Sequence, residues 1–430
     1  MVKRAFVFFI IYLSLFIPGT AWGTLHYYSG SMESRFEMKH TYTIIVPTGL
    51  SSLTLITTPP DNYVLPNNTQ SITERNYTFS VTPSVEDSTD TYGNDFKRFK
   101  WTNPKQGTIT VTDSYMVTTS SDWNRFVTSD RFPFDSSGLP DLITAYMKPS
   151  GEVQSDHPIF INLVNSLTAG LTTQWEVLKT LNGWIMDNIY YGSNPYGHDA
   201  LSTFALKYGN CANYAHIALA MIRAAGIPAR ITHGYSLHKS YSLPTGSAPV
   251  DADWGEGTHA WIEVYYPSLG WVPYDPQRDL HHVDTHRVLW GRGSDAKGIV
   301  GGTYWTFSSV PSGYPNTYHS LNVNWIEDSI ALSYIKSTNE INSKSFSSKV
   351  TYIDYDADSD EDKILDWWEQ QIIDYSQTDE ITSFADVLPE DDFDGDNFSN
   401  MKEYQKETDP TDPDSHPPRT MPWLMLLLDD

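Results

Sequence analysis

The sequence predicts a multidomain protein with an N-terminal all-β sandwich-like domain, a central α+β domain and a small C-terminal α-helical module. Three observations lead to this fold class: alternating runs from about residue 35 to 117, helical patterns followed by strands from about 159 to 335, and an acidic repeat after residue 354. A chain of 430 residues with 40% hydrophobic residues can form two or three cores, at roughly 100–200 residues per domain.

The predicted boundaries follow changes in composition along the chain. We expect a signal peptide at 1–23, the β-rich domain at 24–150, the α+β domain at 151–336, a Ser/Asn/Lys-rich linker at 337–353, a paired acidic module at 354–415 and a short apolar-ended tail at 416–430.

The N-terminus has the pattern of a secretory signal. Lys3 and Arg4 precede the apolar run Ala5–Ile17, and the small residues Ala21 and Gly23 lie just before Thr24. The alternative is a membrane helix, but the run is shorter than the ~20 residues a span needs. We therefore predict a cleaved signal and a secreted or periplasmic protein.

The β-rich domain is predicted from short runs rich in β-branched and aromatic residues, separated by turn formers such as Pro47-Thr-Gly and Pro59-Pro-Asp-Asn. The runs are 36–46, 53–57, 77–81, 96–101 and 108–117.

Cys211 is the only cysteine of the chain. Exported proteins usually pair their cysteines in disulfides, so a lone thiol is either a buried inert residue or a reactive one. Its context favours reactivity, because Asn210 is a good N-cap, Gly226 and Pro228 end the helix, and Cys211 lies in the first turn. There the helix dipole stabilises the thiolate and so lowers the thiol pKa from its usual value of ~8.5. Gly209 leaves room for a substrate carbonyl, which the Cys211 N–H can bind as an oxyanion donor.

A thiolate needs a base, and the base needs a group that orients it. His259 opens an alternating run to Tyr266, the chain turns at Pro267-Ser-Leu-Gly270, and a second run returns to Asp275. In such a hairpin His259 and Asp275 can be cross-strand neighbours, provided that the turn has an odd length or a bulge occurs, for which Pro273 is the candidate.

These segments resemble the transglutaminase-like superfamily. The matching pieces are Gly209-Asn-Cys211, Arg223-Ala-Ala-Gly-Ile-Pro-Ala-Arg230, Gly234-Tyr235, His259-Ala-Trp-Ile-Glu263 and Gly270-Trp-Val-Pro-Tyr-Asp275-Pro276. The spacings of 48 residues from Cys to His and 16 from His to Asp are similar to the bacterial branch. Over about 165–280, the resemblance implies a papain-like α+β fold with Cys211 as nucleophile, His259 as base and Asp275 as orienting group.

Other polar residues are weaker candidates. The stretch His281-His282, Asp284 and His286 has the composition of a metal site, although a surface loop is the more frequent explanation. Asn182 and Trp184 are the side chains we considered as oxyanion donors. Position on the helix makes His216 unsuitable as the base, because five residues turn it about 140° from Cys211.

The acidic module contains two calcium-loop patterns separated by 34 residues. Each offers oxygens at positions 1, 3, 5, 9 and 12 and a backbone carbonyl at 7, and both resemble EF-hand loops, which supply the six to eight hard oxygens that Ca²⁺ prefers. The predicted ligands are Asp358, Asp360, Asp362, Ile364, Asp366 and Glu369 in the first loop, and Asp392, Asp394, Asp396, Phe398, Asn400 and Glu403 in the second. Position 6 favours positive φ, which Asn397 tolerates and Lys363 tolerates poorly. A disordered acidic tail is the alternative.

Charge excludes one class of partner. The formal charge is −25, and residues from 354 onward carry 24 acidic against 4 basic side chains. No basic surface for a nucleic acid is present.

We predict an exported cysteine-dependent enzyme that acts on amide bonds of protein or peptide substrates, by acyl transfer or by hydrolysis. Two structural calcium ions are expected in the C-terminal module and none in catalysis; that module is the candidate surface for a cell-surface or extracellular partner. The alternative is a non-enzymatic, calcium-rigidified surface or matrix protein.

Overall fold

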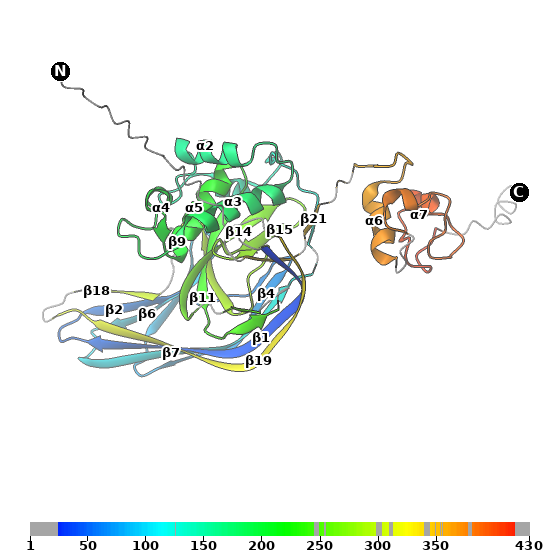
Figure 1. Cartoon of the computed structure of the whole chain (residues 1–430). Coiled ribbons are helices and arrows are strands. Elements are labelled where there is room, and N and C mark those ends of the chain that lie inside the picture. The colour runs from blue at the N-terminus through cyan, green and yellow to red at the C-terminus, as the bar shows by residue number, and fades with distance from the viewer. Residues whose placement is uncertain are drawn as a thin grey trace, which may run out of the picture.

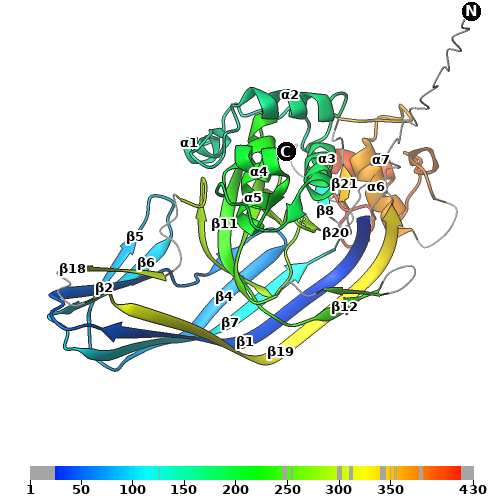
Figure 2. The same ribbon diagram turned by 60° about the vertical axis from the view of Figure 1, so that its left-hand side comes forward.

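The computed structural model describes residues 25–417, apart from 125, 245–248, 253–254, 298–302, 309–312, 339–344, 349, 353, 355 and 377–380. The predicted signal peptide and most of the apolar-ended tail lie outside the described residues. In Figures 1 and 2 the helices of the central domain lie together on one side of long, curved β-strands. Among the helices that the structure describes, we find none with the length and apolarity of a membrane span.

Strand β1 (Leu25–Val46) is the axis of the larger sheet. It pairs antiparallel with β19 (Asn316–Thr338) on one side and with β7 (Gly107–Asp122) on the other. From Phe36 to Ile44, alternate side chains are buried, as the two-residue period of a strand requires when one face covers a core.

Two sheets form the predicted sandwich. The larger has the order β16-β20-β1-β7-β4-β3 with β19 on β1, and the smaller has the order β18-β2-β6-β5. Their inner faces bury Tyr42, Ile44, Leu55, Phe99 and Trp101 among other side chains. The remaining bounds are β2 Ser52–Thr57, β3 Tyr63–Val64, β4 Asn68–Phe79, β5 Ser84–Thr89, β6 Asp95–Thr102, β8 Phe126–Thr128, β16 Asp279–Leu280, β18 Thr303–Ser308 and β20 Ser345–Ser348.

The sandwich uses both ends of the described chain, which differs from the predicted boundary at 150. Strands β18 and β19 follow the central domain in sequence, yet β18 pairs with β2 and β19 pairs with β1 along nearly its whole length. Strand pairing is non-local, so the alternation within 316–338 indicates a strand without indicating its sheet.

The central domain packs helices on a four-stranded sheet of order β15-β14-β11-β17. Helix α5 (Cys211–Ala224) is buried on nearly every side from Asn213 to Arg223. The other elements are α1 Asp141–Thr144, η1 Ala145–Met147, α2 Pro158–Leu167, α3 Gln174–Asn188, α4 Ala200–Leu206, β9 Tyr190–Tyr191, β10 Tyr208–Gly209, β11 Ala229–Ser236, β12 Tyr241–Leu243, β13 Val250–Ala252, β14 Gly257–Tyr266, β15 Gly270–Tyr274 and β17 Arg287–Gly293.

The segment 337–353, predicted as a linker, contains strands in the structure. β20 pairs with both β1 and β16, and β21 (Val350–Tyr352) pairs with β8. Phe346 is buried between the rings of His26 and Tyr28. The polar composition is typical of a linker. The two strands are nevertheless held in place, because the Phe346 ring is buried and β20 and β21 pair with the edges of neighbouring strands.

The C-terminal module has two loop–helix units. The loops precede α6 (Asp366–Tyr375) and α7 (Asn400–Lys406), and η2 (Phe384–Asp386) lies between them. A small shared core forms around Ile364, Trp368, Ile372 and Val387. A helix follows each loop, and α6 and η2 lie between the two loops, but in the described residues no helix precedes the first loop. The module therefore differs from the full helix–loop–helix pair expected of EF-hands.

Candidate active site

Cys211 occupies the first position of α5, as the sequence predicts. The Asn210 side chain accepts a hydrogen bond from the Ala212 N–H at 3.1 Å. The N–H of Cys211 has no partner four residues earlier within its helix, because the first turn never does. The thiol therefore lies at the positive end of a 14-residue helix, where a negative charge is stabilised.

Asn213 fixes the chain on both sides of the thiol, a role that sequence reasoning missed. Its Oδ1 accepts the Asn210 N–H at 3.1 Å, and its Nδ2 donates to the Gly197 carbonyl at 3.0 Å and to Thr203 Oγ1 at 2.7 Å. A Cβ at Gly209 would lie 2.2 Å from the Asn213 Cβ. Gly209 is thus needed for this close packing, which adds to the predicted reason of substrate access.

His259 and Asp275 meet across the β14–β15 hairpin. His259 Nε2 lies 2.8 Å from Asp275 Oδ2. Tyr266 pairs with Gly270 and Ile262 with Tyr274 without a register shift. The turn therefore has an odd length of three residues, and no bulge occurs at Pro273. This register puts the two side chains on one face of the hairpin.

The thiol and the imidazole form the other half of the site. With Nε2 on Asp275, Nδ1 is the ring nitrogen left to hydrogen-bond Cys211. Burial raises the pKa of Cys211, but the hydrogen bond and charge of His259 and the Ala260 N–H outweigh it and lower the pKa. Burial lowers the pKa of His259, but Asp275 and the thiol raise it overall to about 9. These opposite shifts favour a thiolate–imidazolium pair near neutral pH.

Arg287 holds Asp275 from behind and was also missed by sequence reasoning. Its Nη2 lies 2.8 Å from Asp275 Oδ2 and 3.0 Å from Asp279 Oδ2, and its Nη1 lies 2.8 Å from Asp284 Oδ1. All four side chains are buried. Burial raises the pKa of Asp275, but the charges of His259 and Arg287 outweigh it and hold the pKa well below its usual range. A lone arginine in a sequence gives no sign of such a role.

The stretch 281–286 is neither the surface loop nor the metal site considered above. Its side chains are buried, because it passes between the central sheet and the sandwich: His281 Nε2 contacts Tyr266 Oη at 2.7 Å, and Asn68 Nδ2 donates to the Val283 carbonyl at 2.8 Å. Within the described ranges, the only side-chain groups placed to hold a metal ion are the two aspartate triplets of the C-terminal module.

Of the two candidate oxyanion side chains, Asn182 uses its amide within its own helix, and the ring of Trp184 packs on a neighbouring ring. Asn182 is buried and its Nδ2 donates to the Leu178 carbonyl at 3.0 Å within its own helix. Trp184 stacks on Phe204 with ring centroids 5.9 Å apart. The backbone N–H of Cys211 remains the expected donor.

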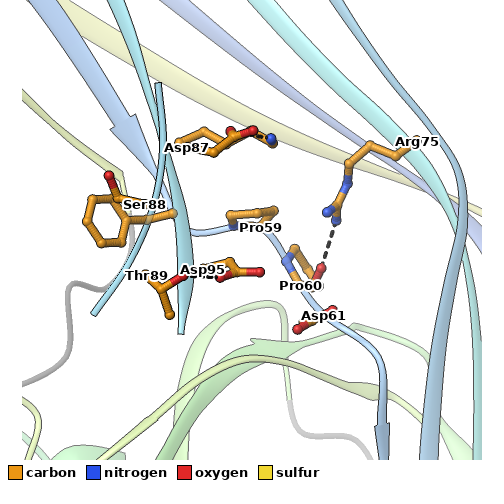
Figure 3. Close-up of a pocket in the computed structure, with 10 residues that line it drawn as sticks. Pro59, Pro60, Asp61, Arg75, Asp87, Ser88, Thr89 and Asp95 are labelled. Carbon is orange, nitrogen blue, oxygen red and sulfur yellow. Dashed lines mark hydrogen bonds and ion pairs between the residues drawn. The ribbon is translucent and has the colours of Figure 1, made fainter. Parts of the chain in front are cut away.

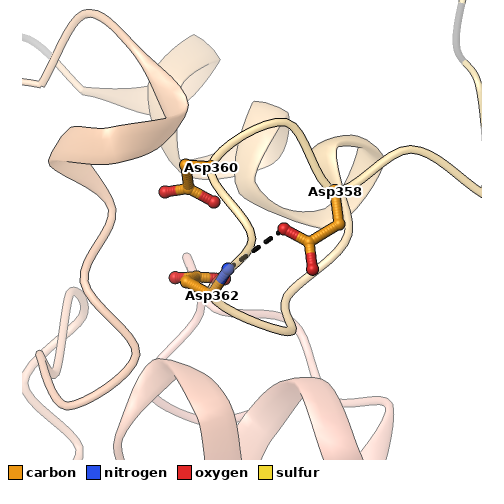
Figure 4. A group of neighbouring side chains, drawn as sticks. All are labelled: Asp358, Asp360 and Asp362. Carbon is orange, nitrogen blue, oxygen red and sulfur yellow. Dashed lines mark hydrogen bonds between the residues drawn. The ribbon is translucent and has the colours of Figure 1, made fainter.

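The C-terminal loops have matching backbones. In each loop, positions 4 and 6 have positive φ: Glu361 and Lys363 in the first, Gly395 and Asn397 in the second. One ligand oxygen each from Asp358, Asp360 and Asp362 lies within 4.8 Å of the others (Figure 4), and the same holds for Asp392, Asp394 and Asp396.

The glutamates at position 12 complete this arrangement. Glu369 and Glu403 are buried, and both oxygens of Glu369 and the Oε2 of Glu403 have no hydrogen-bond partner. One oxygen each of Asp360, Asp362, Asp394 and Asp396 also has none. Burial and then the neighbouring aspartates raise the pKa of Glu369 to about 8 and that of Glu403 to about 7. Unsatisfied oxygens and crowded negative charge fit a hard divalent cation. Asp366 differs from prediction, because both of its oxygens accept hydrogen bonds from Ser359.

A polar pocket of about 310 Å³ lies in the sandwich and shares no residue with the thiol site. Arg75 in its wall donates to the Pro60 carbonyl at 2.9 Å (Figure 3), and Lys97 pairs with Asp87 at 2.6 Å. Arg75 also pairs with Asp113 behind the wall, and we assign no chemistry to this pocket.

Comparison with known proteins identifies what the central domain resembles. Residues 161–276, which include Cys211, His259 and Asp275, match the model of the transglutaminase-like superfamily. The chain is 32% identical over 150 residues, 35% of its length, to the uncharacterized protein YebA of Bacillus subtilis, and this covers 19% of that protein. It is 37% identical over 73 residues, 17% of its length, to the protein-glutamine gamma-glutamyltransferase of Pseudomonas aeruginosa, covering 10% of that enzyme. The chain thus spans a fifth or less of each of these two relatives.

A solved structure shows the same fold. A candidate cysteine protease from Cytophaga hutchinsonii covers 72% of this chain and 100% of its own, with a TM-score of 0.51 and 19% identity. The chain therefore contains a transglutaminase-like core within a multidomain, mostly β protein.

The thiolate–imidazolium pair predicts the pH dependence of alkylation. Since the pKa of Cys211 is lowered and that of His259 is raised to about 9, iodoacetamide should react with the wild type well below pH 8. His259→Ala should slow alkylation at least about tenfold at pH 6.5, since one pKa unit changes the thiolate fraction about tenfold. Labelling by mass spectrometry reports this thiol alone, because the chain has one cysteine. His238→Ala, at an exposed histidine, is the control. Equal rates in wild type and His259→Ala from pH 6 to 8 would refute the pairing.

Proposed function

We propose that this protein is an exported cysteine-dependent enzyme that forms a thioester with carboxamide groups of protein or peptide substrates. The observation that carries the proposal is the 2.8 Å contact of His259 with buried Asp275, beside a thiol in the first turn of α5. The protein-glutamine gamma-glutamyltransferase of Pseudomonas aeruginosa supports glutamine side chains as acyl donors through its similarity over 73 residues.

The geometry supports a two-stage reaction. Cys211 Sγ attacks the carboxamide carbon, and the oxygen of the tetrahedral intermediate is stabilised by the Cys211 N–H. The imidazolium of His259 gives its proton to the leaving nitrogen, so that ammonia or an amine departs and a thioester remains. His259 then accepts a proton from an incoming amine or water, which attacks the thioester and restores the thiolate. An amine gives cross-linking, and water gives hydrolysis.

Asp275 and Arg287 serve this cycle without touching the reacting atoms. Asp275 fixes the ring of His259 and stabilises its positive charge, as the third member of a triad does. Arg287 shares the Asp275 Oδ2 atom and so limits how far Asp275 can raise the pKa of His259. Arg287 is therefore a positioning residue that tunes the base.

The second candidate function is a non-enzymatic surface or matrix protein in which the core only binds. The observation that supports it is the C-terminal module with its predicted calcium loops, which contribute no residue to the reaction described above. The two functions differ in whether Cys211 is needed for turnover.

Export is part of the proposal and depends on the signal-peptide pattern at 1–23. A cleaved signal places the enzyme in the periplasm or outside the cell.

Incubation with casein and a fluorescent primary amine tests the enzyme directly. The wild type should either attach the amine to casein or release cleaved or deamidated casein, and Cys211→Ser should reduce that turnover by at least ~10³-fold, as loss of a triad nucleophile does. Mass spectrometry of casein identifies which product forms. Suppose the folded wild type forms none of these products although its thiol still reacts with iodoacetamide below pH 8. That result would favour the non-enzymatic binding protein.

We further propose that the C-terminal module binds two structural calcium ions through the predicted ligands, with Asp366 supporting its loop through Ser359 instead of contacting the ion directly. Calcium would neutralise carboxylates that repel one another in each loop and so stabilise the small core around Trp368. Its role is structural, because each cluster lies wholly within residues 358–403.

Calcium binding should depend on pH in a direction fixed by the raised glutamate pKa values. In the metal-free module, a carboxyl group whose pKa is raised from 4.5 to about 8 stabilises the fold below pH 4.5, and this contribution is lost as the pH rises through 8. Calcium must displace those protons, so its apparent Kd should rise at least about tenfold from pH 8 to pH 6. Calorimetric titration of the full chain measures both the Kd and the released protons.

Matched variants separate the two sites. Glu369→Gln and Glu403→Gln should each abolish one calcium site, whereas Asp412→Asn, at an exposed position outside both loops, should abolish neither. Deletion of 357–430 should leave turnover within a few-fold, because β20, β21 and the Arg131–Asp354 ion pair stay in place. Absence of binding up to ~10 mM calcium, beyond the weak end of extracellular sites, would contradict the proposal.

A further inference from the structure

Four tyrosines in β9, β10 and the loop after β9 are exposed to solvent. Tyr190, Tyr191, Tyr196 and Tyr208 are 59%, 67%, 75% and 49% exposed, respectively. We refer to these four residues as the tyrosine rim. Exposed aromatic residues are ordinary when single, but a group of them next to a reactive centre indicates a binding surface.

The rim adjoins the nucleophile through β9 and β10. These strands pair in parallel, with Tyr191 opposite Gly209 and Tyr190 opposite Tyr208. Gly209 lies two residues before Cys211 in the chain. Burial raises the pKa of Tyr191, and the charge of the Cys211 thiolate raises it further, in agreement with this proximity. A ligand on Tyr191 therefore lies beside the thiol.

The rim is held in place by the fold. The rings of Tyr190 and Tyr208 contact one another with centroids 5.6 Å apart. A Cβ at Gly192 would lie 3.0 Å from the Tyr208 ring, so this glycine lets the ring pack flat on the backbone. The loop that carries Tyr196 is fixed by the Asn213 hydrogen bond to the Gly197 carbonyl and by the bond from the Tyr196 N–H to Asn194 Oδ1 at 2.9 Å. A fixed aromatic surface binds with a small loss of side-chain entropy.

The open edge of β9 identifies the type of ligand. The Tyr190 N–H donates to the Lys207 carbonyl at 2.8 Å, and the Gly192 N–H donates to the Gly209 carbonyl at 3.0 Å. Because these flanking groups point toward β10, the N–H and C=O of Tyr191 point to the other edge of β9. The described part of the chain places no further strand on that two-stranded sheet. Such an edge pairs with an extended polypeptide, whereas a glycan offers no matching ladder of amides.

We propose that the tyrosine rim is the subsite for the acyl-donor polypeptide. The donor pairs its backbone with Tyr191 and places flat apolar side chains, aromatic or proline, against the rings of Tyr190, Tyr191, Tyr196 and Tyr208. The enzyme thus selects reactive glutamines that have such neighbours in sequence. This inference rests on the proposed function for the identity of the reacting amide, but the binding itself needs no turnover.

Binding to Cys211→Ala protein tests the proposal without chemistry. The probes are two fluorescent heptapeptides with one central glutamine, one flanked by phenylalanine and the other by serine. Fluorescence anisotropy should show the phenylalanine peptide binding at least fivefold more tightly. Tyr190→Ala and Tyr191→Ala should each reduce that preference to twofold or less, and Tyr191→Phe should retain it because the ring remains. Tyr318→Ala, at a tyrosine 61% exposed on β19, is the matched control and should leave both Kd values unchanged.

In the active background, the rim variants should raise KM with a smaller change in kcat, while iodoacetamide alkylation of Cys211 stays at the wild-type rate. Equal affinities for the two peptides, or a preference that survives both alanine variants, would overturn the proposal. So would binding of an oligosaccharide that the alanine variants abolish while peptide binding is unchanged. If casein is not turned over but the peptide preference and its loss are seen, the rim stands as a peptide site and only the proposed reaction fails.

Discussion

The structure depends on the burial of one carboxylate. Asp275 is fully enclosed, and a buried charge costs several kcal/mol unless it is paired and hydrogen-bonded. Here Oδ2 receives both His259 and Arg287, and Oδ1 accepts the Gln277 N–H at 3.1 Å. The same arginine also holds Asp279 and Asp284. Burial, then Asp275 and Asp284, raise the pKa of Asp279 well above its usual range, in opposition to the charge of Arg287.

This ion cluster connects the chemistry to the rest of the fold. Asp279 begins β16, which pairs with β20, and β20 in turn pairs with β1 of the sandwich. Thr119 on β7 donates to the carbonyl of Thr285, two residues before Arg287, at 2.7 Å. Residues 279–287, which lie behind Asp275, are therefore held between the central sheet and the sandwich. Because Arg287 fixes Asp275, this packing also restricts the orientation of the His259 ring. The acidic loops of the C-terminal module contribute no residue to this ion cluster.

Local patterns predicted the parts of the site that are local. The N-cap and C-terminal signals around Cys211 gave the correct helix, because capping depends on residues within one turn. The hairpin was predicted correctly because its three-residue turn sets the register of His259 against Asp275. The aspartates of both acidic loops converge, since the spacing of two residues within a tight loop decides that geometry.

The parts that sequence could not give are those fixed by distant contacts. Nothing in the run 316–338 reveals that it pairs with β1, and nothing around Arg287 reveals three carboxylates gathered from positions 275, 279 and 284. The polar stretch 281–286 read as surface, yet the fold buries it and supplies hydrogen-bond partners from the sandwich. Residues with several donors and acceptors, such as Asn213, show their role only when their partners are in place.

The most direct test of a thiolate maintained by this buried triad is the ultraviolet titration of Cys211. The absorbance of the wild type near 240 nm, minus that of Cys211→Ser, follows the ionisation of this single thiol as the pH is raised. The account predicts a thiolate already formed at neutral pH, with an apparent pKa below the usual ~8.5, and a return toward that value in Asp275→Asn. One ionisation at or above ~8.5 in the wild type, unchanged in Asp275→Asn, would contradict it.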